Sequence, residues 1–207
     1  PPDVARYTRA GELIDINDDI KQRALALAGS KDDLFEIVYT VADWVTTNIA
    51  YNISTLTLDA TQKSSWVLEE RKGVCDEMTA LFISMLRSLG IPARFVSGLS
   101  YTNLPEFAKP WGGHGWAEVY FPGVGWVPFD VTYGTYGFLD PSHIKLQDSF
   151  DAKSDSVEFE MLASQTTLLT RSVETTVDVV DRTSDADLPL QITLEPFDSH
   201  VALDASN

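Results

Sequence analysis

The segment from Arg71 to Pro92 constrains folding most strongly, because a glycine-containing loop leads directly into a long amphipathic helix with a defined end. Gly90 is suited to the helix C-cap, and Pro92 prevents continuation because it has no backbone N–H to donate. Residues 93–99 then resemble a strand. One face of the helix carries apolar side chains at three-and-four spacing: Met78, Leu81, Phe82, Met85, Leu86 and Leu89. The pattern therefore predicts a helix packed by one face against a strand-containing core.

Cys75 is the only cysteine among the 207 residues, and it falls at the start of this helix. Unpaired backbone N–H groups and the helix macrodipole favour negative charge there, so we expect a lowered thiol pKa and a reactive thiolate. A lone cysteine on a helix is also commonly an inert buried residue, so its position alone assigns no role. A single cysteine permits no intramolecular disulfide and so does not indicate the redox compartment.

The composition limits the possible classes of function. A chain of 207 residues with 44% hydrophobic residues can form one core, or one core and a smaller module. A formal net charge of −16 excludes nucleic acid as a partner, because phosphate binding needs a basic surface. The sequence holds no apolar stretch of membrane-spanning length. It begins with proline instead of methionine, so we expect it to be part of a longer polypeptide.

The sequence suggests three regions. Residues 1–30 are expected to form an N-terminal extension packed on a core at 31–150. Residues 151–207 contain 12 acidic and 3 basic residues and several β-like runs. They are expected to form a β-rich acidic extension, or the start of a second β domain. Within the core we expect, in order, a helix from about 31 to 49, an irregular connection at 52–63, a helical turn at 65–68, an aromatic loop at 100–113, a hairpin of strands 115–121 and 126–131, and an aromatic loop at 133–138.

His114 and Asp130 follow Cys75 in the order needed for thiol-based acyl transfer, which requires a nucleophile, a base and a group that orients the base. The hairpin gives a geometric condition for this triad. Opposed residues of an antiparallel pair share a face, so an even-numbered loop would turn Asp130 away from His114. We therefore predict an odd-numbered loop or a bulge that uses Gly123 or Gly125.

Four blocks of the sequence together resemble the core of the transglutaminase-like superfamily, over roughly residues 30–150. Cys75 and His114 are 39 residues apart, and Asp130 follows 16 residues later. The blocks are Gly73-Val74-Cys75, Leu86-Arg87-Ser88-Leu89-Gly90-Ile91-Pro92-Ala93-Arg94-Phe95-Val96-Ser97-Gly98, His114-Gly115-Trp116-Ala117-Glu118-Val119-Tyr120, and Gly125-Trp126-Val127-Pro128-Phe129-Asp130-Val131-Thr132.

The resemblance implies a papain-like α+β fold, in which the cysteine helix packs on an antiparallel sheet that carries the histidine and the aspartate. The family includes glutamine transamidases, cysteine proteases and glycoprotein deglycosylases. The deglycosylases usually have paired CxxC zinc ligands, so a chain with one cysteine does not belong to that branch. Gly115 stands where relatives commonly have alanine, and we expect little effect from this. Val131 stands where many relatives have proline, so we expect the rim beside Asp130 to differ.

The function implied is thiol-dependent acyl transfer on peptide or glutamine-type amides, most simply as a cysteine protease or amide hydrolase. The alternatives are a protein-glutamine transamidase and a catalytically silent interaction module of a larger surface protein. The partner would be a protein or peptide substrate, and an extracytoplasmic or cell-surface location is favoured. The residues imply no cofactor. Calcium, used by some relatives, lacks a recognisable oxygen-rich loop, and neither Cys nor His stands at metal-ligand spacing.

The residues that assist the triad are less defined. The backbone N–H of Cys75 is a natural oxyanion donor, and the second donor is expected from Asn52, Tyr51 or Trp66. Trp111, in the aromatic loop, is the candidate for a substrate groove. The remaining candidates are assigned structural positions: Trp116 and Trp126 in the core, and His143 and His200 at the surface.

Overall fold

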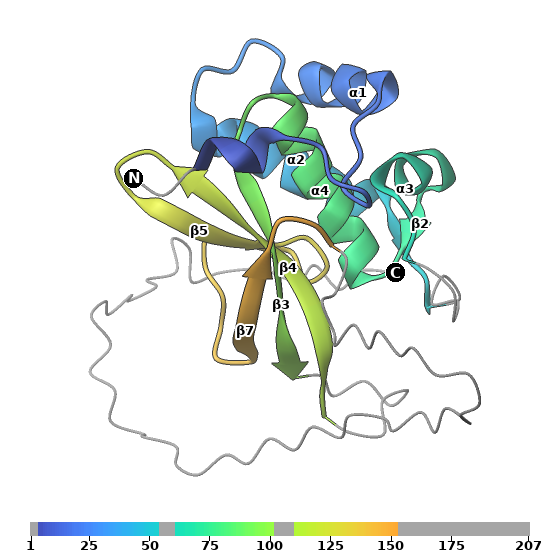
Figure 1. Cartoon of the computed structure of the whole chain (residues 1–207), viewed down its shortest axis with the longest axis vertical. Helices are drawn as coiled ribbons and strands as arrows, with labels where there is room; N and C mark the ends of the chain where they lie inside the picture. Colours follow the sequence, from blue (N-terminus) through green and yellow to red (C-terminus); the bar gives the residue numbers. More distant parts are fainter. Residues whose placement is uncertain (1–3, 54–60, 102–109, 153–207) are drawn as a thin grey trace, which may run out of the picture. The chain divides into compact units, whose positions relative to one another are not determined.

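Helix α4 (Cys75–Ser88) runs between the other helices and a β-sheet in the computed structural model, which describes residues 4–53, 61–101 and 110–152 (Figure 1). Every residue from 77 to 87 in this helix is buried. The sequence predicted one buried face, but the helix is enclosed on all sides because helices cover the part of its surface that the sheet leaves free. Central burial gives the helix, and therefore Cys75 at its start, a fixed position.

Helices α1 and α2 begin at side-chain caps that the sequence supplies. The carboxamide of Asn17 accepts the N–H of Ile20 at 2.9 Å, and the carboxylate of Asp33 accepts the N–H of Glu36 at 2.7 Å. The helix expected from about residue 31 is confirmed, with its first turn slightly later. The elements are the 3-10 helix η1 (Val4–Thr8), α1 (Asp18–Ala28), α2 (Leu34–Asn48) and α3 (Ser64–Glu70).

The main sheet is antiparallel and has five strands in the order β6-β5-β4-β3-β7. A separate pair of two-residue strands, β1 and β2, is parallel. The α+β fold with a helix packed on an antiparallel sheet is as expected. The strands are β1 (Ala50–Tyr51), β2 (Lys72–Gly73), β3 (Ala93–Tyr101), β4 (Trp111–Phe121), β5 (Gly125–Asp130), β6 (Thr135–Tyr136) and β7 (His143–Ser149).

Several boundaries differ from those expected. The loop expected at 100–113 is shorter, because β3 continues to Tyr101 and β4 already begins at Trp111. The loop expected at 133–138 contains β6. Strand β7 was not expected at all, and it lies beside β3 at the sheet edge (Figure 1). Pairing between strands far apart in sequence supplies the backbone hydrogen bonds that stabilise these segments as strands.

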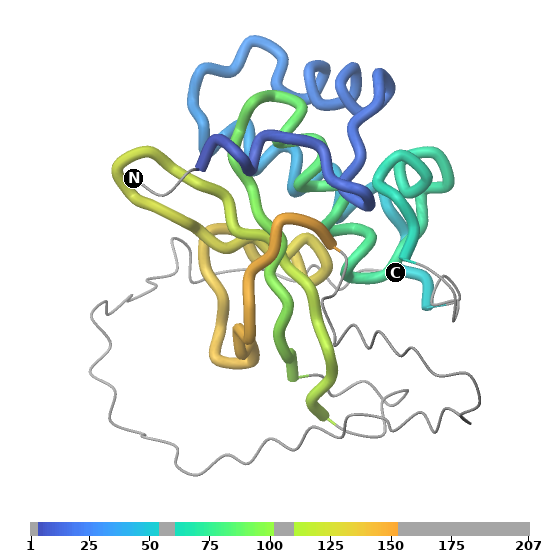
Figure 2. The backbone as a smooth tube through the Cα atoms, in the orientation of Figure 1, coloured from blue at the N-terminus to red at the C-terminus, as the bar shows by residue number. Residues whose placement is uncertain are grey.

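The N-terminal segment contributes to the same core as α4. Ile14, Ile20 and Ala24 are fully buried in that core. Figure 2 shows the segment after β7 returning beside this N-terminal part, where the carboxylate of Asp151 accepts the backbone N–H of Ile14 at 2.9 Å. The division of the chain at residues 30 and 150 stays a prediction. The strands expected beyond Asp151 lie outside the described residues.

Trp116 is 1% exposed, in agreement with its expected core position. Trp126 is half-buried and packs edge-to-face on Tyr120, with ring centroids 5.4 Å apart. Within the described ranges, each helix is too short or too polar to cross a membrane.

Candidate active site

Cys75 occupies the first position of α4, as the sequence predicted. Its preceding residue, Val74, is the N-cap and donates its backbone N–H to the Glu77 carboxylate at 3.0 Å. Glu77 also accepts the backbone N–H of Gln62 at 3.0 Å, and it is 1% exposed. This carboxylate holds the loop before Cys75 in place by satisfying N–H groups that would otherwise be buried without partners.

The hairpin meets the geometric condition stated for it. Phe121 pairs with Gly125, so the connecting loop has an odd number of residues, 122–124. Gly123 and Gly125 both have positive φ, at 82° and 105°, which the turn requires and which glycine adopts without strain. This register places Asp130 on the face that carries His114. The Nε2 atom of His114 lies 2.6 Å from Oδ2 of Asp130.

Asp130 is fully buried and is surrounded by hydrogen-bond donors. Its Oδ1 accepts the backbone N–H groups of Thr132 and Tyr133 at 2.8 and 3.1 Å. Burial by itself raises the pKa of the Asp130 carboxyl, but hydrogen bonds from His114, His143 and the Tyr133 backbone hold that pKa well below its ordinary value. An ionised carboxylate only accepts hydrogen bonds, so the proton of neutral His114 lies on Nε2 and leaves Nδ1 as an acceptor.

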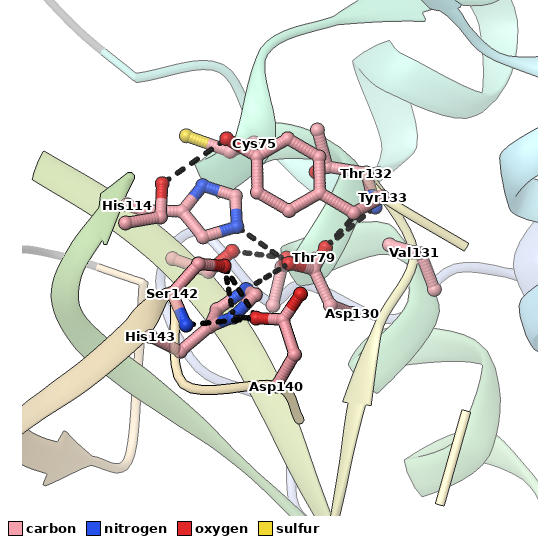
Figure 3. A network of polar contacts seen from close by, with 12 residues as sticks. Cys75, Thr79, His114, Asp130, Val131, Thr132, Tyr133, Asp140, Ser142 and His143 are labelled. Carbon is pink, nitrogen blue, oxygen red and sulfur yellow. Dashed lines mark hydrogen bonds and ion pairs between the residues drawn. The ribbon is translucent and has the colours of Figure 1, made fainter. Parts of the chain in front are cut away.

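The imidazole of His114 lies between Cys75 and Asp130 (Figure 3). The ring of Tyr133 stacks on it with centroids 4.7 Å apart and an angle of 19° between the planes. The ring of Trp116 also lies near the imidazole of His114, with centroids 6.1 Å apart. These aromatic neighbours restrict the ring, so its Nδ1 remains turned away from Asp130. The sequence did not identify Tyr133 as part of the site, because it lies in a loop with several other aromatic residues.

The electrostatics of the thiol differ from those expected. Cys75 is partly exposed, yet desolvation raises the pKa of its thiol, and the neighbouring carboxylate of Asp76 raises it further. Hydrogen bonding with the backbone of Gly115 lowers this pKa, but its effect is smaller than the combined effect of desolvation and Asp76. The expectation of a lowered pKa was wrong, because it considered the helix N-terminus alone and omitted burial and Asp76. Burial and Asp76 therefore favour the thiol over the thiolate at Cys75.

Gly115 has a larger role than expected. A Cβ atom at this position would lie 2.4 Å from Oδ1 of Asp76 and 2.5 Å from Cζ of Phe95. The carbonyl oxygen of Gly115 accepts a hydrogen bond from Oγ1 of Thr79 at 3.1 Å. The absence of a side chain thus lets α4 approach β4 next to His114, and the expectation that glycine here has little effect was wrong.

The three candidates for the second oxyanion donor are placed differently. Tyr51 pairs with Gly73 through the β1–β2 contact, and Asn52 donates its backbone N–H to the Gly73 carbonyl at 2.9 Å. Both therefore lie beside the loop that ends at Cys75. Burial and the nearby Cys75 raise the pKa of Tyr51 to about 12. The Tyr51 phenol and the Asn52 carboxamide both carry a donor at neutral pH, so either side chain can supply the second hydrogen bond.

The two candidate tryptophans lie on different elements, Trp66 in α3 and Trp111 at the start of β4. Trp66 lies against the ammonium group of Lys72, 5.4 Å from the ring centroid, and lines a surface groove with Arg23 and Arg71. Trp111 packs edge-to-face on Tyr101 at 5.6 Å, at the far end of the β3–β4 pair and three residues before His114. Trp66 thus packs on the segment that leads to Cys75, and the position of Trp111 on the His114 strand is compatible with a groove role.

His143 is a part of the site that the sequence placed at the surface. Its side chain is 2% exposed, and its Nε2 lies 3.1 Å from Oδ2 of Asp130 (Figure 3). The expectation failed because β7 was not recognised, and β7 is the strand that brings His143 beneath Asp130. His200 lies outside the described residues.

His114, Asp130 and His143 offer ligand atoms within 4.8 Å of one another, which raises the question of a metal ion. Two donors at the usual 2.0–2.1 Å from a tetrahedral zinc ion lie about 3.4 Å apart. The nitrogen–oxygen distances here are 2.6 and 3.1 Å, so the atoms are spaced for hydrogen bonds. The geometry fits a proton between each pair of atoms better than a shared ion.

Comparison with known proteins identifies the family. The model of the transglutaminase-like superfamily matches residues 21–131. The uncharacterized protein YebA of Bacillus subtilis is 30% identical over 166 residues, which cover 72% of this chain and 22% of YebA. The uncharacterized protein Rv2569c of Mycobacterium tuberculosis is 28% identical over 138 residues, covering 65% of this chain and 41% of that protein. The chain thus spans less than half the length of these relatives.

Solved structures show a similar fold. A candidate cysteine protease from Cytophaga hutchinsonii superposes with a TM-score of 0.62 and 23% identity, covering 75% of this chain and 50% of that one. The periplasmic domain of TgpA from Pseudomonas aeruginosa has a TM-score of 0.50 and 24% identity, covering 64% of this chain and 48% of that one. Because the family model matches more than half of the chain and includes both the cysteine helix and the histidine–aspartate hairpin, the protein belongs to the transglutaminase-like superfamily.

Proposed function

We propose that this protein is a thiol-dependent acyl-transfer enzyme that acts on peptide or glutamine-type amides, with Cys75, His114 and Asp130 as its catalytic triad. The observation that supports this most strongly is the buried His114–Asp130 hydrogen bond of 2.6 Å beside the helix that begins at Cys75. Asp130 orients the imidazole and stabilises its cation, which is the function of the third member in such triads.

The proposed reaction begins from the neutral thiol. As the Cys75 sulfur attacks the amide carbon, its proton passes to Nδ1 of His114, and the carbonyl oxygen becomes an oxyanion. The Cys75 backbone N–H, with Tyr51 or Asn52 as the second donor, would stabilise that oxygen. The carbon–nitrogen bond then breaks, the departing amine takes the proton from His114, and the acyl group remains on sulfur as a thioester.

We propose that water completes the reaction. His114 would accept a proton from the water as the water attacks the thioester, and would return that proton to the departing sulfur. A primary amine in place of water would make the protein a transamidase, and the experiment below separates these outcomes.

The test is incubation with an unfolded protein substrate, with and without a primary amine, followed by mass spectrometry of the products. Shortened peptides or deamidated glutamines support hydrolysis, whereas amine adducts indicate transamidation. Cys75→Ser and His114→Gln should each lower either activity at least about 10²-fold. If the wild-type protein modifies no substrate and His114→Gln alkylates at Cys75 like the wild type, the protein is a silent module.

We also propose an extracytoplasmic location and a role as one segment of a longer protein. Support comes from the periplasmic domain of TgpA, which has a similar fold, and from the small share of YebA that this chain spans. Cell fractionation with an antibody against residues 61–101 would test the location. Recovery of the antigen in the cytoplasmic fraction alone would contradict it.

A further inference from the structure

His143 lies between two carboxylates. Its Nε2 is 3.1 Å from Oδ2 of Asp130, and its Nδ1 is 3.0 Å from Oδ1 of Asp140. Figure 3 shows the imidazole of His143 placed between the two acids, with Ser142 beside it. The hydroxyl of Ser142 donates to Asp140 and lies 3.2 Å from Nδ1 of His143. Both ring nitrogens therefore face hydrogen-bond acceptors.

A neutral imidazole cannot satisfy this arrangement, because one of its nitrogens would direct a lone pair at a carboxylate. The imidazolium form donates from both nitrogens and has an acceptor for each. Hydrogen bonding to Asp130 is the main cause that raises the pKa of His143, against the opposing effect of burial, and Asp140 raises it further. Geometry and electrostatics thus agree on a cation at this position.

The surroundings contain no other described charge that would compete for this cation. The imidazole of His114 on β4 is 5.7 Å from that of His143, centroid to centroid, and the ring of Tyr133 is 5.6 Å away. The indole of Trp116 closes a third side at 5.5 Å. Asp130 and Asp140 are therefore the charged groups in contact with His143 among the described residues.

Asp130 consequently shares one oxygen atom between two imidazoles. Its Oδ2 accepts from His114 at 2.6 Å and from His143 at 3.1 Å. The second bond restricts rotation of the carboxylate, and the positive charge of His143 weakens the attraction of Asp130 for a proton on His114. A triad with an isolated aspartate would stabilise the His114 cation more strongly and release its proton less readily to a leaving amine.

We propose that His143 is a fourth member of the site, a positioning residue that holds Asp130 in line with His114 and moderates the basicity of His114. This rests on the proposed function of the triad. Asp140 acts through His143 by keeping it protonated. The role of His143 is distinct from catalysis itself, because His143 contacts Asp130 and not the reacting atoms.

The experiment is an NMR titration of the imidazole nitrogens. The chain has three histidines, so one His→Gln variant at each position assigns the signals. In the wild-type protein, we expect His143 to show two protonated nitrogens at neutral pH and to titrate above the ordinary imidazole pKa of about 6.5. His143→Gln keeps an N–H donor and removes the charge, and should move the resonance of the His114 Nε2 proton downfield, because Asp130 then binds that proton more strongly.

A second variant tests the same proposal in case the His143→Gln protein does not fold. The side chain of Asp140 is 54% exposed, so Asp140→Asn should leave the fold intact while lowering the pKa of His143. Asp148→Asn is the matched control, because Asp148 lies on β7 with His143 but pairs with Arg94 and Lys145. It should leave the pKa of His143 unchanged.

The outcomes separate this proposal from the proposed function. If His143 titrates at or below about 6.5, or if His143→Gln leaves the resonance of the His114 Nε2 proton unchanged, the proposal is wrong. These readouts require neither substrate nor turnover. If the titrations agree but neither Cys75→Ser nor His114→Gln changes activity on amides, the triad function fails and the hydrogen-bonded position of His143 stands.

Discussion

Oγ1 of Thr79 donates a hydrogen bond of 3.1 Å to the carbonyl oxygen of Gly115. Thr79 lies one turn after Cys75 in α4, and Gly115 directly follows His114 in β4. Both partners are buried. Their hydrogen bond joins α4, which carries the thiol of Cys75, to β4, which carries the imidazole of His114. The spacing between Cys75 and His114, the proposed nucleophile and base, therefore depends on the side chain of Thr79.

Replacing Thr79 by valine should test this link. Thr79→Val keeps the shape but leaves the Gly115 carbonyl without its partner, so the free energy of unfolding should fall by about 1–3 kcal/mol. Looser spacing between Cys75 and His114 should lower the rate of amide turnover by about tenfold. Urea unfolding and turnover kinetics measure both effects. Thr79→Ser restores the hydroxyl and should recover most of the activity, and equal losses in the two variants would contradict the link.

Gly115→Ala should disturb the contact between α4 and β4. The added Cβ would meet Asp76 and the ring of Phe95 at distances that real atoms do not adopt, so one of them must move. We expect a loss of about 1–3 kcal/mol in the free energy of unfolding, measured by urea denaturation. Gly112→Ala on the same strand is the control, because a Cβ there meets nothing within 4 Å. Similar losses in both variants would show that strand propensity, not crowding, is responsible.

Asp76→Asn should lower the pKa of the Cys75 thiol. The Asp76 carboxylate is the second cause, after desolvation, that raises this pKa, and the amide removes its charge. Alkylation by iodoacetamide, followed between pH 6 and 10, should therefore shift to lower pH and become faster at neutral pH. An unchanged pH profile would mean that desolvation alone sets the thiol pKa. Glu70→Gln, which removes an exposed acid on α3, is the control.

The same substitution should raise stability at neutral pH. Burial raises the pKa of Asp76 in the folded protein above its ordinary value of 3.8. The folded state therefore binds a proton that the unfolded state has lost, and stability decreases as the pH rises from 3.8 through the raised pKa. Asparagine carries no such dependence, so Asp76→Asn should unfold at higher urea concentration than the wild type at pH 7 and not at pH 3. The reverse order would contradict the raised pKa.

Arg87→Lys should weaken the hydrogen bonds that hold the N-terminal segment against the core. The buried guanidinium donates to the carbonyl oxygens of Ala93, Arg9 and Phe150 at 2.9, 2.9 and 2.7 Å. An ammonium group cannot reach all three, because it lacks the planar fork of arginine. We expect a loss of about 2–4 kcal/mol in the free energy of unfolding. Arg23→Lys, at an exposed position of α1, should change stability by less than about 0.5 kcal/mol.

The elements that could be predicted from the sequence are those whose signals lie within one short segment. Helix α4 could be predicted because its apolar spacing, Gly90 and Pro92 all lie within one segment. Helix α1 was missed because only Ile20 and Ala24 of its 11 residues are buried, so its apolar stripe is weak. Strand β7 was missed because it is stabilised by pairing with β3, about 45 residues earlier, and its Leu146 is 65% exposed. Edge strands of this kind have little alternation to detect.

The sequence by itself determined the order and spacing of Cys75, His114 and Asp130 and the helix that begins at the thiol. It left an odd-numbered loop or a bulge as the ways to bring His114 and Asp130 to one face, and the register of the folded hairpin has the odd-numbered loop. Only the tertiary structure decided the charge environment: the raised thiol pKa, the contact of Asp76 with Gly115, and the second imidazole on Asp130. Helix and strand patterns depend on neighbours along the chain. Electrostatic energies depend on distance through space and on burial, which the folded chain alone defines.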